Sequence, residues 1–451
     1  MSGGIRNPIM RRPNPQRRRA AGGRATAPTA RAVMTKGEGT SVWYVQHYAG
    51  GPGIGRYHRG HHLATALQPL GWRMSVVAAS FHHLMNDASA KPPHMDVDGV
   101  AYRFVPTPRY EGNGIGRFRN MWSFGGAVRR ALEASGEERP RVLVYSSPHL
   151  FAAATVERAC RAAGVGFVLE VRDLWPLSFH ELMGMSRAHP LALYVGRLER
   201  RAYARADAVV SLLPASREYM EDHGLARGKW HYIPNGVAQE ERDAPEPCPP
   251  ELSAALERLR GEGRRLVAYA GAMGVPNGCE LMAEALAGLD AEERRRIALV
   301  MVGAGSEKAR LEGLAARLDL PMVFFPQMPK AQVWSLLAEV DAGIIVLPRK
   351  ALFEYGVSPN KIFDYFLAGK PVIQALSAGN DPVLEAGAGW SGPAEDVATL
   401  TSNLRTFLGA SDDDLATRGH AGRSWVLANH EYTALARRYD TVLRSVTAPA
   451  D

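Results

Sequence analysis

Cysteine is scarce in this sequence. The chain has 3 cysteines among 451 residues, Cys160, Cys248 and Cys279, and they are far apart with no Cys-x-x-Cys pair. A disulfide framework or a thiolate zinc site needs cysteines in matched sets, so the odd number and the wide spacing support neither. We therefore expect a reducing compartment.

Long uncharged apolar runs are also missing. No run reaches the roughly 18 residues that a membrane-spanning helix needs, and residues 1–40 lack the apolar core of about 7–15 residues typical of a secretory signal. Hydrophobic residues make up 46% and charged residues 22% of the chain, which excludes a disordered or collagenous protein. The length predicts two or three folded domains.

Acidic residues are nearly absent from the first 40 positions. This segment holds nine basic residues and one acidic residue, Glu38, so it alone carries the +8 net charge of the whole chain. The remainder is therefore neutral, and we expect no nucleic acid partner. Residues 1–40 are poor in large apolar side chains, which predicts a disordered basic tail.

Three interpretations of this tail are open. It can be a plain solvated tail, or a segment upstream of a true start at Met34. It can also be a basic arm that contacts anionic lipid headgroups.

Strand and helix patterns alternate along the rest of the chain. Short apolar runs followed by amphipathic stretches predict parallel strands with helices on both faces. The predicted strands are 41–47, 74–79, 100–105, 142–146, 166–171, 208–213 and 231–234 in a first set, and 266–270, 297–302, 322–325, 342–347 and 371–374 in a second set. We therefore predict an α/β protein with two doubly wound domains.

The alternation is interrupted once. Residues 238–263 are rich in proline and charge, and we interpret them as a linker or a surface insertion. The predicted domains are therefore 41–237 and 264–425, followed by a helical segment at 426–451. In open parallel sheets, ligands bind beyond the C-terminal ends of the strands, so we expect the site in a cleft between the domains.

The most informative stretch is residues 356–373, GVSPNKIFDYFLAGKPVI. Ser358 is a favourable N-cap, Pro359 suits the first helical position, and Gly369 suits the position that ends a helix. The stretch therefore predicts a short helix that leads into a strand. An ordinary helix cap without a ligand is the alternative.

The start of this predicted helix is suited to an anion. Unpaired N–H groups and the helix dipole favour negative charge there, and Lys361 adds a full cation. Asn360 and Asp364 are four residues apart and share a helix face. Asn360 fits a phosphate, and the Asp364 carboxylate fits two hydrogen bonds from a ribose diol.

A glycine-rich loop, GGPGIGR at 50–56, follows the first predicted strand. Glycines let backbone N–H groups approach a phosphate closely. The candidate positions of this loop are Gly51, Gly53, Ile54, Gly55 and Arg56. The loop does not fit a dinucleotide-binding signature, because the glycine spacing is wrong and no acid follows strand 74–79. The alternative is a tight strand–helix turn.

Arg172 and Asp173 directly follow the predicted strand 166–171, at the ligand end of the sheet. The Arg172 guanidinium and the Asp173 carboxylate are therefore candidates for contact with a ligand. Glu170 on the same strand is a weaker candidate. The alternative is a structural ion pair between Arg172 and Asp173.

Two histidines, His58 and His62, are four apart on a predicted helix. No HExxH motif and no partner carboxylate motif accompanies them, so we predict no metal site. Solvated or capping histidines, or contacts with an acceptor, are the alternatives.

Beyond these local patterns, the chain resembles a known family along residues 41–440. The stretch at 356–373 and YIPNGV at 232–237 resemble the family 4 retaining glycosyltransferases of the GT-B fold, and in particular the bacterial WbuB-like group of fucosamine-type transferases. The other segments that carry the resemblance are 47–67, 109–124, 169–179, 205–224, 268–274, 300–308 and 377–383.

The resemblance implies two Rossmann-like domains facing across a cleft, with a C-terminal helix that returns to the N-terminal domain. It implies an acceptor on the first domain and a nucleotide sugar, with UDP favoured, on the second. Gly271, Met273 and Gly303 are then donor-binding positions, beside Ser358, Pro359, Asn360, Lys361 and Asp364. The loop at 50–56 is implied to face the donor diphosphate and the acceptor, and Arg172 and Asp173 to lie beside the reacting sugar. Arg172, Asp173 and Lys361 are the catalytic candidates.

The sequence departs from the family pattern in two places. The family has two glutamates eight residues apart, and these positions are Gly356 and Asp364 here. The family's diphosphate-binding Arg and Lys fall on Ala272 and Asn277, and Lys361 with Arg349 or Lys350 is the expected replacement.

The implied activity is metal-independent, retaining transfer to a lipid-linked saccharide at the inner face of the cytoplasmic membrane, in the synthesis of surface polysaccharide such as O-antigen or lipopolysaccharide. Residues 109–124 are a candidate membrane contact. A non-catalytic scaffold that binds nucleotide sugars, an NAD-dependent oxidoreductase, and a GT-B epimerase or phosphorylase are the alternatives.

Overall fold

The computed structural model describes residues 39–447 except 88, 90 and 113. The tail predicted over 1–40 lies outside this range apart from Gly39 and Thr40, and Thr40 already begins the first strand. The described residues belong to one compact unit that begins at Gly39.

The N-terminal sheet has eight strands in the order β3-β4-β2-β1-β5-β6-β7-β8, and within it only the β3–β4 pair is antiparallel. The strands are β1 (Thr40–Val45), β2 (Trp72–Ala79), β3 (His94–Val97), β4 (Val100–Val105), β5 (Val142–Ser147), β6 (Gly166–Val171), β7 (Ala208–Ser211) and β8 (Trp230–Tyr232). The edge strand β3 was not predicted from the sequence, because it is short, polar and largely exposed.

Helices cover both faces of this sheet. They are α1 (Arg59–Leu67), α2 (Ile115–Glu133), α3 (Ala153–Ala163), α4 (Leu177–Met183), α5 (Pro190–Arg205) and α6 (Arg217–Asp222). Successive residues of β1 point to opposite faces, so Trp43 and Val45 pack with α2, α3 and α5, while Val42 and Tyr44 pack with α1. Burial on both faces explains why the central strands are almost wholly apolar.

The C-terminal sheet has six parallel strands in the order β11-β10-β9-β12-β13-β14. They are β9 (Arg265–Ala270), β10 (Ile297–Val302), β11 (Met322–Phe325), β12 (Ala342–Val346), β13 (Val372–Ala375) and β14 (Gly389–Gly392). The sequence analysis missed β14, a four-residue edge strand with two glycines.

The helices of the second half are α7 (Gln239–Asp243), α8 (Pro250–Gly261), α9 (Glu280–Ala287), α10 (Ala291–Arg295), α11 (Lys308–Arg317), α12 (Lys330–Glu339), α13 (Asn360–Leu367), α14 (Pro382–Glu385), α15 (Val397–Gly409), α16 (Asp412–His430) and α17 (Tyr432–Thr447). Four short 3-10 helices are η1 (Gln68–Leu70), η2 (Gly136–Glu138), η3 (Val275–Asn277) and η4 (Ala351–Tyr355). The predicted architecture of two parallel α/β domains is confirmed.

The interpretation of residues 238–263 as a linker was wrong. The segment forms α7 and α8, and the buried Leu252, Leu256 and Leu259 of α8 share a core with Leu266 of β9. Proline at the start of α8 suits a helix N-terminus, and the leucines recur at helical spacing. The proline-rich composition concealed a helix of the second domain.

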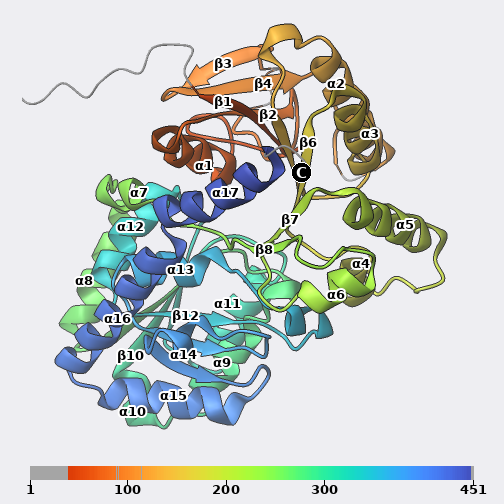
Figure 1. Ribbon diagram of the computed structural model, residues 1–451. Helices are drawn as coiled ribbons and strands as arrows, with labels where there is room; N and C mark the ends of the chain where they lie inside the picture. The colour runs from red at the N-terminus through yellow and green to blue at the C-terminus, as the bar shows by residue number, and fades with distance from the viewer. Residues whose placement is uncertain (1–38, 88, 90, 113, 448–451) are drawn as a thin grey trace, which may run out of the picture. The chain divides into compact units, whose positions relative to one another are not determined.

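The last helix, α17, packs on the N-terminal sheet. Its Leu435, Tyr439 and Leu443 share a core with Tyr44 of β1 and Leu63 of α1. Figure 1 shows α17 in dark blue beside α1. The chain therefore returns to its first sheet after completing the second one, as the GT-B resemblance implies.

Candidate functional site

A cleft of about 1030 Å³ lies at the C-terminal ends of strands from both sheets. A second cavity of about 560 Å³ adjoins it, and Tyr57, Arg172 and Asn235 line both. This position is the one that the rule for open parallel sheets predicts.

Helix α13 presents its first turns to the cleft. Asn360, Lys361 and Asp364 line the larger cavity, whereas Ser358 and Pro359 line the smaller one. After the helix, Gly369 has a left-handed φ of +71°, as predicted for the residue that ends it.

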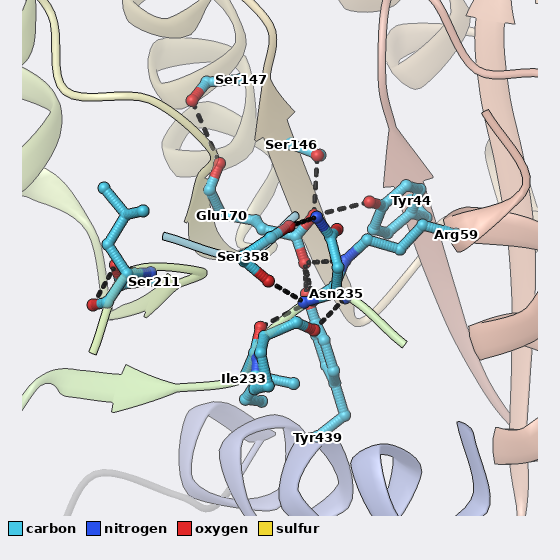
Figure 2. A network of polar contacts seen from close by, with 12 residues as sticks. Tyr44, Arg59, Ser146, Ser147, Glu170, Ser211, Ile233, Asn235, Ser358 and Tyr439 are labelled. Atoms are coloured by element: carbon cyan, nitrogen blue, oxygen red, sulfur yellow. Dashed lines mark hydrogen bonds and ion pairs between the residues drawn. The ribbon is translucent and has the colours of Figure 1, made fainter. Parts of the chain in front are cut away.

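The prediction that Ser358 caps α13 was wrong. The Ser358 hydroxyl accepts a hydrogen bond from the Asn235 backbone N–H at 3.0 Å, and its carbonyl accepts one from Asn235 Nδ2 at 2.9 Å. Figure 2 shows these contacts between the loop after β8 and the segment before α13. Ser358 thus ties a first-domain loop to the segment that leads into α13.

Asp364 belongs to a chain of charged groups on the cleft wall. Lys330 Nζ lies 3.2 Å from Asp364 Oδ1 and 2.8 Å from Glu241 Oε2. Burial raises the pKa of Asp364, and the Lys330 ammonium opposes that shift. Burial alone would lower the pKa of Lys330, but the two carboxylates raise it. Lys330 is therefore held as a cation between two acids.

Lys361 reaches the cleft through a gap that glycine leaves open. A Cβ atom on Gly271 would lie 1.9 Å from Lys361 Cε. Gly303 packs still more tightly, since its Cβ would lie 1.8 Å from the Gly271 carbonyl oxygen. Burial lowers the pKa of Lys361, whose ammonium lies over the Tyr269 ring at 5.4 Å. An anion in the cleft would stabilise its charge.

The structure explains why Gly356 cannot carry the family's first acid. Gly356 has a φ of +104°, a conformation that residues with a side chain rarely adopt. A Cβ there would also lie 2.4 Å from Pro214 Cδ. A side chain at this position would therefore strain the backbone and displace Pro214.

The glycine-rich loop faces the cleft with Gly51, Gly53, Gly55 and Arg56. Ile54 does not face it, because its side chain is buried in the N-terminal core. A Cβ on Gly51 would lie 2.1 Å from the Tyr102 hydroxyl, and one on Gly55 would lie 2.7 Å from the Leu84 carbonyl oxygen. The glycines therefore serve a tight strand–helix turn and expose backbone to the cleft at the same time.

Arg172 lies at the junction of the two cavities, and Asp173 lines the smaller one with an exposed side chain. The Arg172 guanidinium stacks over the Tyr57 ring at 5.2 Å, and its buried Nη1 has no hydrogen-bond partner. Desolvation in this cavity raises the pKa of Asp173 and the nearby Arg172 charge opposes that shift, but within the described part of the chain the two side chains form no ion pair closer than 4.0 Å.

Glu170 has a structural role. It is fully buried and accepts hydrogen bonds from Tyr44 at 2.6 Å, Ser146 at 2.7 Å and Tyr439. Arg59 Nη2 pairs with Glu170 Oε2 at 2.9 Å, and Figure 2 shows this network. Burial alone would raise the pKa of Glu170, but Arg59 holds it at about 2.

Several predicted positions lie away from the cleft. Met273 is fully buried in the second core. Arg349 contacts Glu395 and the Ala394 carbonyl instead of lining a cavity, and Lys350 lines neither cavity. The cations that line the larger cleft are the predicted Lys361 together with Arg56, Arg59, Arg172 and Lys330.

Sequence reasoning missed Lys330 and Glu241. Lys330 follows the C-terminal end of β11. Because ligands bind beyond the C-terminal ends of parallel strands, this position could have indicated Lys330 as a site residue. No sequence pattern indicated Glu241 as a site residue, because it lies in the segment that was interpreted as a linker. The structure places Glu241 Oε1 2.9 Å from His62 Nε2 and 3.3 Å from His58 Nδ1, which supplies the carboxylate that the sequence analysis did not find.

Several solved structures have a fold similar to that of this chain, and three of them are named proteins. Sucrose-phosphate synthase from Thermosynechococcus elongatus has 16% identity and a TM-score of 0.68, with 91% of this chain and 100% of that chain covered. Anabaena HepE in complex with UDP and glucose has 15% identity and a TM-score of 0.60, with 90% and 100% covered. WaaG, a glycosyltransferase involved in lipopolysaccharide biosynthesis, has 15% identity and a TM-score of 0.62, with 89% and 99% covered. These likenesses establish the GT-B fold.

Two family matches then identify the chain. Residues 52–236 match the glycosyl transferase 4-like domain, and residues 264–409 match the glycosyl transferases group 1 domain. Together they span most of the described chain, which therefore belongs to the family 4 type of GT-B glycosyltransferases and is an enzyme of that class. A comparison with curated protein sequences finds no match. The family assignment excludes the alternative that the chain is an NAD-dependent oxidoreductase.

Within the described residues, no helix is both long and apolar enough to cross a membrane.

Proposed function

We propose that this enzyme transfers a sugar from a nucleoside diphosphate sugar, with UDP as the favoured nucleotide, to a saccharide hydroxyl with retention of configuration. The observation that carries the proposal is that Asp364 and Lys361 of α13 line one cleft with Arg172 of the other sheet. The complex of the similar HepE with UDP and glucose supports a UDP-linked donor.

The donor would lie along the start of α13. The Asp364 carboxylate accepts hydrogen bonds from the ribose diol, and Lys330 keeps this carboxylate oriented. The α13 N-terminus and Lys361 face the diphosphate, where negative charge grows as the anomeric C–O bond breaks. These groups stabilise the departing diphosphate, so we propose that the transfer step needs no divalent metal or other cofactor.

The acceptor would enter through the smaller cavity. Its hydroxyl attacks the anomeric carbon on the face of the leaving group, the bond to the diphosphate breaks, and a diphosphate oxygen takes the hydroxyl proton. Asp173 lines this cavity and orients the sugar or acceptor hydroxyls, in a region where Gly356 offers no acid. Arg172, at the junction of the cavities, binds the phosphate charge.

We further propose that the acceptor is lipid-linked and that the enzyme works at the inner face of the cytoplasmic membrane, in the WbuB-like group that builds surface polysaccharide. Support comes from α2, which exposes 87% of Ile115, 50% of Trp122 and 39% of Phe118. The exposed Arg119 lies between these side chains in the sequence, and Trp122 stacks on Tyr194 of α5. Exposed aromatic side chains beside cations suit an anionic membrane surface.

The donor site is tested with two variants of α13. We expect Asp364→Ala and Lys361→Ala each to lose most of the transfer from UDP-sugars, and to lose the thermal stabilisation that UDP gives the wild type. Lys370→Ala is the matched control, because this partly buried lysine follows the same helix and bonds the Ala338 carbonyl outside the cleft. Near-full activity of both cleft variants would contradict the proposal.

The membrane surface is tested by sedimentation with vesicles that contain anionic lipid. We expect the double variant Phe118→Ser, Trp122→Ser to bind at least several-fold more weakly, because it removes the apolar side chains that would enter the interface. Leu318→Ser is the control, since Leu318 is 41% exposed in the other domain. Equal binding of both variants would remove α2 from the membrane contact.

A further inference from the structure

Three metal-ligating side chains meet on the wall of the larger cleft. Glu241 Oε1 lies 2.9 Å from His62 Nε2 and 3.3 Å from His58 Nδ1, and the three atoms all lie within 4.8 Å of one another. Around a tetrahedral zinc ion with bonds of about 2.0–2.1 Å, neighbouring ligand atoms are about 3.3 Å apart. Two of the three separations are therefore close to those on one face of such a site, and the third, between the two histidine nitrogens, is no more than 4.8 Å.

The fold holds each of these ligands in place. His58 and His62 are four residues apart at the start of α1, so their rings share one helix face. The His62 ring stacks on Tyr432 with centroids 4.8 Å apart. Lys330 Nζ binds the second oxygen of Glu241 at 2.8 Å, which leaves Oε1 directed at the histidines.

The hydrogen bond at the far side of His58 constrains its proton. His58 Nε2 lies 2.9 Å from the Gly55 carbonyl oxygen, and a carbonyl can only accept, so Nε2 carries the hydrogen. In a neutral ring, Nδ1 then presents a lone pair to Glu241 Oε1, which is also an acceptor. This contact is favourable only when a cation lies between them, either a second ring proton or a metal ion.

Histidines that bind metals have the same arrangement on their far side. The ring nitrogen that does not bind the ion donates to a backbone carbonyl or a carboxylate, which fixes the tautomer. Two histidines and one carboxylate form a ligand set that suits Zn²⁺ and similar ions, and three protein ligands leave one position open. All three residues line the cleft, so this open position faces the space that the substrates use.

We propose that His58, His62 and Glu241 bind a divalent transition metal ion of the zinc class, with water or a substrate oxygen as the fourth ligand. Lys330 faces two carboxylates, so these three groups carry a net charge of −1. A divalent ion on Glu241 changes this to +1, which favours an anionic ligand in the cleft. The transfer step remains with the residues named above, and the ion contributes to binding.

The test uses Co²⁺ with the full-length protein after treatment with a chelator, because Co²⁺ reports its geometry in visible absorption. We expect binding of about one equivalent, with the strong visible bands of a four-coordinate site. We expect no thiolate charge-transfer band, which separates this site from binding at the three cysteines. Zn²⁺ should displace the Co²⁺ and remove the bands.

Two variants and one control assign the site. His62→Ala and Glu241→Gln should lose the bands, whereas His94→Ala, an exposed histidine on β3, should retain them. Circular dichroism and the melting temperature establish that each variant is folded, and His58→Ala is the alternative where one is not. Absence of stoichiometric binding, or unchanged bands in the folded variants, would overturn the proposal and leave a second ring proton as the cation. Donor binding is measured separately, so failure of either proposal leaves the other standing.

Discussion

The presence or absence of a Cβ atom at a few positions determines which side chains reach the cleft. Lys361 extends across the position where residue 271 would carry a Cβ, and Asp364 keeps its orientation through Lys330. Gly356 disfavours a side chain where the family has its first acid, because its backbone has a positive φ and Pro214 is close. At this scale the shape of the cleft depends as much on absent side chains as on present ones.

Gly271→Ala tests the gap beneath Lys361. The new methyl group would displace the end of a flexible lysine rather than backbone, so we expect the fold to be retained. Loss of a charge-assisted hydrogen bond to the diphosphate costs about 1.5–3 kcal/mol, a reduction in UDP affinity of roughly 10- to 150-fold. Titration calorimetry with UDP measures this change.

Gly274→Ala is the control for that experiment. Its Cβ would meet nothing closer than 3.6 Å, so UDP affinity should be unchanged. Equal affinity of Gly271→Ala and wild type would mean that Lys361 does not bind the diphosphate.

Glu199 provides a test of pH dependence away from the cleft. This side chain of α5 is buried, and Tyr203 and Tyr219 each donate a hydrogen bond to it at 3.1 Å. Burial raises the pKa of Glu199 from 4.5 to about 8. Between these values the unfolded chain loses the proton that the folded protein keeps, so the free energy of unfolding falls as pH rises.

Glu199→Gln removes this titration. We expect the variant to gain stability relative to wild type as pH rises from about 4.5 to about 8, with little difference at lower pH. Urea denaturation at pH 5 and pH 8 measures the difference. Parallel pH profiles for the two proteins would show that Glu199 is ionised in the folded state.

At the scale of elements, one buried ion pair joins distant segments. Arg59 of α1 pairs with Glu170 of β6 and donates to the carbonyls of Ile233 and Pro234 after β8. Tyr439 of α17 donates to the same carboxylate. The network therefore fixes the last helix and the loop that carries Asn235 to the first sheet.

Glu170→Gln should destabilise the protein strongly. The change leaves the Arg59 guanidinium buried without its counter-charge, which costs about 3–5 kcal/mol. Glu133→Gln is the matched control, because its pair with Arg129 is exposed and such pairs contribute about 0.2–1 kcal/mol. Similar urea midpoints for the two variants would contradict a structural role for the Glu170 network.

At the scale of the molecule, charge is divided unequally along the chain. Residues 1–38 carry the net +8, and the remainder is neutral. Attraction to anionic lipid is about 1 kcal/mol for each basic residue near the surface, and it is screened by salt. The proposed membrane contact therefore has two separable parts, the charge of this segment and the exposed apolar side chains of α2.

Removal of residues 1–38 separates these routes. We expect the shortened protein to bind anionic vesicles at least roughly tenfold more weakly at low salt, and the difference to vanish at high salt. Binding that depends on Phe118 and Trp122 should persist in both proteins. Identical binding at low salt would exclude the basic-arm interpretation and leave the solvated tail or the start at Met34.

Much of the fold could be predicted, because strand and helix patterns are local. The predicted strands 166–171, 297–302 and 322–325 agree with β6, β10 and β11 in full, since buried parallel strands are continuous apolar runs. Helix α8 was missed because proline and charge obscured its leucine spacing. Ser358 was wrongly predicted to cap α13, because the same hydroxyl can accept a hydrogen bond either from its own helix or from a distant segment. The Asn235 backbone N–H lies close enough to donate to it, and this contact is not visible in the local sequence.

The sequence by itself determined the two-domain α/β plan, the helix at 360–367 and the glycosyltransferase family, because these depend on patterns that are contiguous in the chain. Only the tertiary structure decided which charges meet. Glu241 lies 179 residues from His62 along the chain, yet their side chains are hydrogen-bonded. The pair forms because α7, which follows the first sheet in the chain, lies beside the start of α1. No local sequence pattern predicts a contact between segments so far apart.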